Sequence, residues 1–285
     1  MTQYYFVSFA SSDLWRSLKR IGRQVKATGL YDHILACNET DLDPNFLNNH
    51  ADKLVKGTRG FGYWMWKPQI ILQTLQKMND GDVLTYCDAG CHIREQGKKR
   101  LEDYLALART CSSGIVAFSA DPHVTSPLFT YDGRKLPDLI EGHWCKGDLL
   151  DYFGVRNDEA ITHTPTIGAG IIFLRKTPEV LVFIERWLKV FTDDFSLVND
   201  DPSRSPNLPN FNEHRHDQPI FAIMCKQQGV SLVSAYEYWY PCKEQDPKKR
   251  VMQPDWETLK LSPIHARRDK DVGWLKKRLR KWGFK

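Results

Sequence analysis

The sequence predicts an α/β fold in which helices flank a mixed, Rossmann-like sheet. Short apolar segments typical of buried strands alternate with segments whose apolar residues recur every three or four positions, as on one helix face. Small or acidic residues follow directly after several predicted strands, where open α/β sheets gather their ligands. With 285 residues, 41% hydrophobic, the chain is long enough for one large core.

The first elements predict a βαβ unit. The segment Tyr4–Ala10 is a candidate buried strand, and His33–Cys37 is the next one. Between them, a helix is indicated by Leu14, Leu18, Ile21 and Val25, which follow the capping sequence Ser11-Ser12-Asp13. Because this unit has neither G-x-G-x-x-G nor a P-loop, a dinucleotide or ATP cradle is not expected.

The second group of elements contains the most informative residues. A loop at 59–68 combines tyrosine and tryptophan with Arg59 and Lys67, which favours an anion site with stacking surfaces. Pro68 suits the first turn of a following helix. The strand at 81–87 then runs into Asp88-Ala89-Gly90, so a carboxylate stands at the strand end. The alternatives are that Asp88 only caps a turn and that the aromatic residues only fill the core.

The second half of the chain continues the alternation. We expect a helix around Leu101–Ala108, a strand at Ile115–Phe118, a strand at Ile167–Leu174 and a helix around Val180–Phe191. Two polar stretches, 119–146 and 192–213, are predicted loops, the second a candidate mobile loop. A last apolar helix follows His216-Asp217-Gln218, where the helix dipole favours a carboxylate. The alternatives here are an N-cap role for Asp217 and a zinc pair formed by His214 and His216.

These motifs, in this order, resemble GT-A-fold glycosyltransferases. Asp88-Ala89-Gly90 resembles the DXD motif, with Gly90 in place of its second Asp, and Ile167-Gly-Ala-Gly170 is similar to a strand of glycosyltransferase family 8 that passes under the donor sugar. His216-Asp217-Gln218 is similar to the Asp-Gln segment of that family, and Pro263-Ile-His265 to its metal-binding His. The phrases Gly-Tyr-Trp-x-Trp-Lys-Pro and His-Arg-His-Asp-Gln resemble bacterial transferases of lipopolysaccharide and capsule synthesis.

The pattern and the resemblance together predict the site residues. The donor nucleotide sugar is expected to contact Ser8, Phe9, Ala10, Arg59, Trp64, Lys67, Asp88, Ala89, Gly90, Gly168, Ala169, Gly170 and His216. Asp217 and Gln218 are the predicted catalytic residues, and Glu141, His143 and Trp144 are predicted to bind the acceptor. Asp121 and Glu141 are alternative general bases to Asp217 if the reaction inverts configuration.

The resemblance implies a divalent metal, Mn²⁺ or Mg²⁺, held on the donor diphosphate by Asp88 and His265. Because Gly90 removes one carboxylate, the alternative is that Lys67 and Arg59 neutralise the leaving diphosphate without a metal. The implied reaction transfers a sugar from a nucleoside diphosphate donor, UDP first, to a saccharide or lipid-linked acceptor. A nucleotidyltransferase and a non-catalytic sugar or membrane-surface binding protein are the alternatives.

The positive charge is concentrated at the C-terminus. We divide the chain into a GT-A-like domain, 1–264, and a basic tail, 265–285, which has nine Lys or Arg and two Asp, against a net charge of +5 for the whole chain. Leu275, Leu279 and Trp282 predict a basic amphipathic helix that lies on an anionic membrane or docks on the domain. Nucleic-acid binding is not expected. Seven scattered cysteines and the lack of a signal sequence predict a cytoplasmic protein. The basic tail, together with the lipid-linked acceptors that the resemblance implies, favours a peripheral position on the inner face of the plasma membrane.

Overall fold

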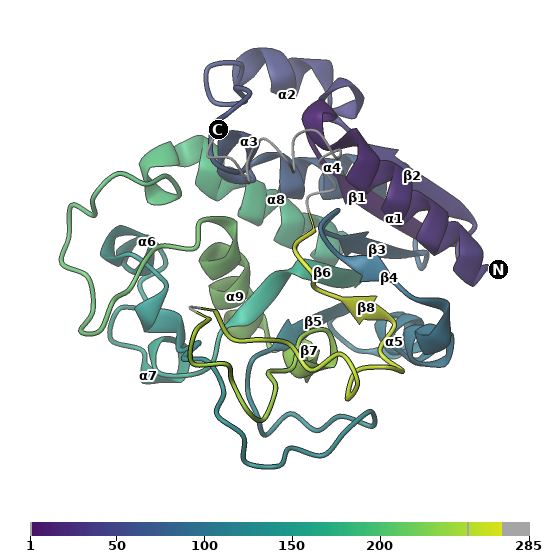
Figure 1. Cartoon of the computed structure of the whole chain (residues 1–285). Helices are drawn as coiled ribbons and strands as arrows, with labels where there is room; N and C mark the ends of the chain where they lie inside the picture. The colour runs from purple at the N-terminus through teal and green to yellow at the C-terminus, as the bar shows by residue number, and fades with distance from the viewer. Residues whose placement is uncertain (1, 250, 270–285) are drawn as a thin grey trace, which may run out of the picture.

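A six-stranded mixed sheet forms the centre of the molecule (Figure 1). The computed structural model describes residues 2–249 and 251–269. In spatial order the strands are β2 (His33–Cys37), β1 (Tyr4–Phe9), β3 (Val83–Cys87), β6 (Ile167–Arg175), β5 (Ile115–Ser119) and β7 (Ser231–Ser234). Only β6 runs against its neighbours in this sheet, since it pairs antiparallel with both β3 and β5 while the remaining pairs are parallel. The predicted mixed α/β sheet is therefore confirmed.

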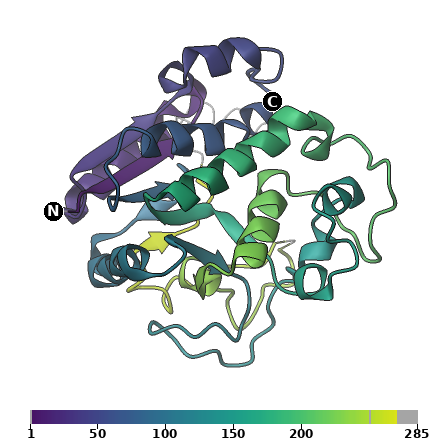
Figure 2. The ribbon, with the colours of Figure 1, turned by 180° about the vertical axis from the view of Figure 1, so that it is seen from behind.

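Helices cover both faces of this sheet, as the two opposite views show (Figures 1 and 2). Two of them, α1 (Trp15–Thr28) and α5 (Lys98–Thr110), pack on one face. The other face is covered by α4 (Trp66–Leu75), α8 (Pro178–Asp193) and α9 (Asp217–Gln228). The shorter helices are α2 (Pro44–Asn49), α3 (Gly60–Tyr63), α6 (Gly147–Tyr152) and α7 (Glu159–Thr162).

Alternation along the strands divides the core between the two faces. On β1, Phe6 packs with the α1 and α5 side, whereas its neighbour Val7 packs with the α4, α8 and α9 side. All five residues of β3 and all five of β5 are buried. A strand covered on both faces has no solvent-exposed side, which explains why these segments are mostly apolar in the sequence.

The topology brings three segments to one edge of the sheet. The parallel strands β1 and β3 both end there, and the two strands that follow β1 in the chain, β2 and β3, lie on opposite sides of it, which makes this a switch point where ligands gather. Because β6 is antiparallel, its beginning lies at the same edge, with Ile171 opposite Cys87. The residues after β3 and those at the start of β6 are thus neighbours.

Most predicted strands and helices are confirmed to within a few residues, but three strands were missed. These are β7 and the two short strands β4 (His92–Ile93) and β8 (Ile264–His265), which pair with each other. The predicted domain boundary after residue 264 falls inside β8. The predicted amphipathic helix of the tail lies outside the described residues. No helix in the described part of the chain has the length and apolar character needed to cross a membrane.

Candidate active site

Lys67 is the centre of a buried polar group that joins three parts of the chain. Its Nζ lies 2.5 Å from Asp217 Oδ2 and 3.4 Å from Asp88 Oδ1, and it donates to the Ala169 carbonyl at 3.2 Å. Lys67 is 2% exposed. An ammonium has three protons, so these three acceptors match its full donor capacity. Lys67 therefore holds the two carboxylates and β6 together.

The charges in this group shift one another's pKa values. Burial alone would lower the pKa of Lys67, but the charges of Asp217 and Asp88 raise it above its ordinary value. Burial raises the pKa of Asp217 to about 6 even though Lys67 opposes this. At neutral pH the pair is an ammonium beside a carboxylate, and with Asp88 the group has one negative charge in excess. Below about pH 6, Asp217 takes up a proton.

Asp88 presents a carboxylate edge to solvent at the end of β3. Its side chain is 39% exposed, while Oδ1 accepts a hydrogen bond from Tyr86 at 2.5 Å. Arg20 on α1 supports the turn from behind by donating to the carbonyls of Ala89 at 2.6 Å and Cys91 at 3.2 Å. The turn is therefore held on its inner side, and Oδ2 remains available for a ligand.

Gly168 and Gly170 form a strip without side chains on β6. A Cβ on Gly170 would lie 2.9 Å from Asp88 Oδ2, and one on Gly168 would lie 2.8 Å from the Tyr238 hydroxyl. The Asp88 amide also donates to the Gly170 carbonyl at 2.8 Å. Only glycine leaves room between β6 and these polar atoms, so a ligand can approach the backbone there.

The segment before α9 is strained and packs on the aromatic loop. His216 has a φ of 58°, and its ring stacks on Trp64 with centroids 5.5 Å apart. Its Nδ1 lies 2.7 Å from the Val198 carbonyl, and burial lowers its pKa, so the ring is neutral. Gln218 is half-buried and donates to Thr166 Oγ1 at 3.1 Å. Backbone strain of this kind gathers at functional sites.

The aromatic loop itself contains further positive φ angles, at Gly60, Phe61, Gly62, Tyr63 and Trp64. Glycine is required at position 60, because a Cβ there would lie 2.5 Å from the Trp64 ring. Arg59, the first residue of this loop, forms an ion pair with Asp200 at 3.0 Å, and Tyr63 donates to the same carboxylate at 3.0 Å. The predicted anion-binding arginine thus already faces a carboxylate, at a solvent-exposed position.

The predicted nucleotide segment lies next to the Asp88 turn. Ala10 packs with Ala89 in a small apolar cluster. Phe9 stacks on Trp66 at 4.1 Å and belongs to the core. Ser8 is fully buried, and its hydroxyl has no hydrogen-bond partner among the described residues. Gly90 lies against the segment after β8, where its carbonyl accepts from the Asp269 amide at 3.0 Å.

The predicted acceptor residues are separate from the Lys67 group. Glu141 is fully buried and pairs with Lys226 at 3.4 Å, so as placed it has no exposed atom for an acceptor. His143 lies 2.8 Å from the Asp138 carboxylate. One face of Trp144 is covered by Arg215, whose guanidinium is 3.8 Å from the ring centroid.

His265 is engaged by protein groups in the β4–β8 pair. Its ring is buried and stacks on Trp256 with centroids 4.5 Å apart, and Nε2 lies 3.0 Å from the Leu259 carbonyl. The described residues contain no group of three or more His, Cys, Asp or Glu placed to hold a metal ion. A divalent ion at Asp88 would therefore need the donor diphosphate and water for most of its ligands. The metal stays a prediction.

Three residues of the site were not anticipated from the sequence. Tyr86 lies on β3, two positions before Asp88. Because side chains two positions apart in extended backbone point to the same face, the sequence could have indicated that Tyr86 lies beside Asp88. Arg20 and Asp200 had none, since each is an ordinary charged residue in a helix or a polar loop.

No protein-family model matches this chain, and no curated protein does. Among solved structures it is similar to a glycosyltransferase involved in glycosylation of the major capsid of PBCV-1 (9% identity, 92% of each chain covered, TM-score 0.42). It is also similar to mouse xyloside xylosyltransferase 1 (9%, 84% of this chain and 86% of that chain, 0.42) and to galactosyltransferase LgtC bound to donor and acceptor sugar analogs (12%, 97% and 94%, 0.42). These neighbours are glycosyltransferases. At such low identities and TM-scores, this likeness assigns no role to any residue of this chain and does not identify its donor.

Proposed function

We propose that this protein is a GT-A-type glycosyltransferase that moves a sugar from a nucleoside diphosphate donor, with UDP as the first candidate, to a hydroxyl of a saccharide or lipid-linked acceptor. The supporting observation is the meeting of three sequence motifs around Lys67. Asp88, the glycine strip of β6 and Asp217 are far apart in the sequence, yet Lys67 contacts all three segments. The bacterial surface polysaccharide or lipopolysaccharide is the proposed destination of the sugar.

In this proposal each group has one task. The donor sugar lies over the backbone at Gly168 and Gly170, and the exposed edge of Asp88 binds its hydroxyls or a metal on the diphosphate. Lys67 compensates one of the two carboxylate charges and keeps Asp217 ionised near neutral pH. Arg59 exchanges Asp200 for the leaving diphosphate, whose charge a guanidinium stabilises well.

Gln218 is the proposed residue beside the reacting sugar carbon. It stands one position after Asp217 at the start of α9, and its amide is oriented by Thr166 Oγ1 at 3.1 Å. A half-buried amide held in this way can direct a donor hydroxyl or the departing group without itself changing charge.

The test is release of nucleoside diphosphate from a panel of nucleotide sugars, with and without Mn²⁺. We expect release from at least one UDP-sugar, and its loss in Asp88→Asn and Asp217→Asn. The matched control is Asp80→Asn, because the Asp80 side chain is 78% exposed and forms only a 3.5 Å pair with Lys176. The proposal fails if no donor is turned over, or if both site variants release nucleoside diphosphate as fast as the control.

A further inference from the structure

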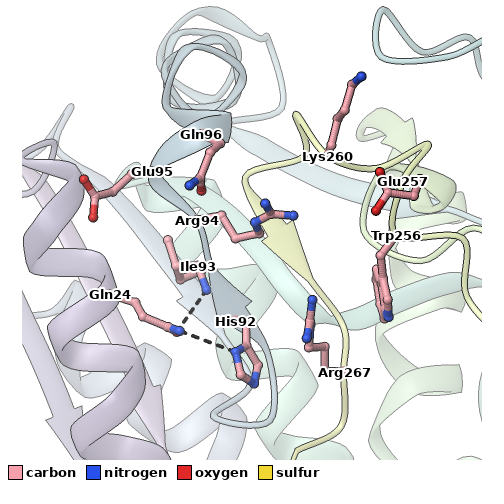
Figure 3. A pocket seen from close by; sticks show the side chains of 10 residues that line it. All are labelled: Gln24, His92, Ile93, Arg94, Glu95, Gln96, Trp256, Glu257, Lys260 and Arg267. Carbon is pink, nitrogen blue, oxygen red and sulfur yellow. Dashed lines mark hydrogen bonds between the residues drawn. The ribbon is translucent and has the colours of Figure 1, made fainter.

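A cavity lies beside the β4–β8 pair (Figure 3). Its volume is about 550 Å³. The lining residues are Gln24, His92, Ile93, Arg94, Glu95, Gln96, Trp256, Glu257, Lys260 and Arg267. Within the described part of the chain, none of them forms a hydrogen bond or ion pair with Lys67, Asp88 or Asp217, and none was assigned a role from the sequence.

Two arginines in this cavity compete for one histidine. Arg94 NH1 lies 3.0 Å from His265 Nε2, and Arg267 NH2 lies 3.4 Å from His265 Nδ1. The Leu259 carbonyl also lies 3.0 Å from Nε2 and needs a donor there. An imidazole ring accepts at no more than one of its two nitrogens. In either tautomer, one guanidinium N–H that points at the ring has no acceptor.

The positive charge of these arginines is not balanced locally. Within the described part of the chain, no carboxylate oxygen lies within 4.0 Å of the Arg94 or Arg267 guanidinium. Arg20, Arg59 and Arg100, in contrast, each pair with a carboxylate. Glu95 and Glu257 line the cavity but are solvent-exposed. Two guanidinium groups that have no carboxylate partner and lie beside the same ring repel each other, and an anion between them would remove that cost.

The surrounding residues fix the geometry of the two cations. Trp256 stacks on His265 with an interplanar angle of 17°, and Arg267 lies over the Trp256 ring at 5.0 Å. The Arg94 backbone amide donates to the Pro263 carbonyl at 2.8 Å, next to the β4–β8 pair. Figure 3 shows Arg94 and Arg267 extending into the same space beside Trp256. Arg94 and Arg267 therefore lose less side-chain entropy on binding a ligand than freely rotating arginines would.

We infer that this cavity binds a phosphate group, as a free phosphate or as the phosphate of a lipid headgroup, between Arg94 and Arg267. Guanidinium forks match the oxygen geometry of phosphate, and the cavity is large enough to admit a substituent on it. The site does not depend on the proposed transferase activity.

The test compares Arg94→Gln and Arg267→Gln with the control Lys77→Gln, which removes the charge of an exposed lysine that does not line this cavity. Inorganic phosphate is titrated calorimetrically into each full-length protein. We expect affinity to fall about tenfold in the two arginine variants and to stay within about twofold in the control. Since Arg267 is exposed, its variant leaves the fold intact even if Arg94→Gln is unstable.

A second arm identifies the source of the phosphate. Each protein is sedimented with vesicles of phosphatidylglycerol or of phosphatidylcholine. An arginine-dependent loss of phosphatidylglycerol binding, with weak binding of inorganic phosphate, supports a lipid phosphate, and the opposite result supports a free phosphate. The inference is overturned if neither ligand binds, or if the arginine variants lose no more affinity than Lys77→Gln in both arms.

Discussion

Lys67 and Asp217 lie 150 positions apart in the sequence, yet their side chains meet at 2.5 Å inside the protein. Lys67 comes from the first turn of α4 and Asp217 from the first turn of α9, two helices on the same face of the sheet. The same ammonium contacts Asp88 at the end of β3. One side chain thus sets both the packing and the charge of the candidate site.

Removing the Lys67 ammonium should destabilise the protein strongly. In Lys67→Met, Asp217 is left buried beside Asp88 without a counter-ion, which costs about 3–5 kcal/mol in the free energy of unfolding. Urea unfolding measures this, with Lys77→Met as the control because Lys77 is exposed just after the same helix. Equal stability of the two variants would contradict the role given to Lys67.

The stability of the protein should depend on the ionisation of Asp217. Its pKa is about 6 when folded and about 4 when unfolded, so between these values only the folded chain keeps the proton. The free energy of unfolding of wild type minus that of Asp217→Asn should therefore fall from about pH 4 to about pH 6, by up to roughly 3 kcal/mol, and then level off. Urea titrations at several pH values test this. A difference that rises over this range would mean that Lys67 outweighs burial and lowers the pKa of Asp217.

A single methyl group on β6 should block the donor site. In Gly170→Ala the new Cβ would lie 2.9 Å from Asp88 Oδ2 and would push that carboxylate away, so donor turnover should fall at least about tenfold with a smaller effect on stability. Gly22→Ala is the matched control, because its Cβ would meet Ala36 at an ordinary 3.7 Å. The measurement is the initial rate of nucleoside diphosphate release by both variants. Unchanged turnover in Gly170→Ala would show that the glycine strip is not part of the donor site.

Freeing Arg59 should strengthen donor binding. Asp200→Asn removes the carboxylate that pairs with Arg59 at 3.0 Å, and an exposed pair of this kind stabilises by up to about 1 kcal/mol, so donor affinity should rise by up to about fivefold. Asp201→Asn serves as the neighbouring control, since Asp201 bonds Asn199 rather than Arg59. If Asp200→Asn binds the donor no better than Asp201→Asn, Arg59 does not exchange partners.

The fold was largely predictable because its central strands are buried on both faces. Segments such as Val83–Cys87 and Ile115–Ser119 are therefore mostly apolar, and such runs are visible in a sequence. The two-residue strands β4 and β8 could not be predicted. A strand of this length is too short to show an alternation of apolar and polar residues, and it is defined only by its partner far along the chain.

The candidate site was predictable where it depends on strand ends and less so where it depends on loops. Asp88 and the β6 glycines meet because β3 and β6 pair. The position of Asp200, in contrast, depends on the path of a polar loop, which Asp148 fixes by accepting the amides of Arg204 and Ser205 at 2.9 and 2.8 Å. Lys67 was expected to face the diphosphate, whereas the structure buries it against two carboxylates.

The most direct test of the account is calorimetric titration of UDP into the protein and into its Asp88→Asn and Gly170→Ala variants, with and without Mn²⁺. We expect the wild type to bind UDP, with Mn²⁺ strengthening binding if Asp88 holds the metal and making no difference if Arg59 alone neutralises the diphosphate. Both variants should bind more weakly than wild type in at least one of these conditions. Absence of UDP binding in both conditions, or equal binding by wild type and both variants, would contradict a UDP-sugar site at Asp88 and the β6 glycines.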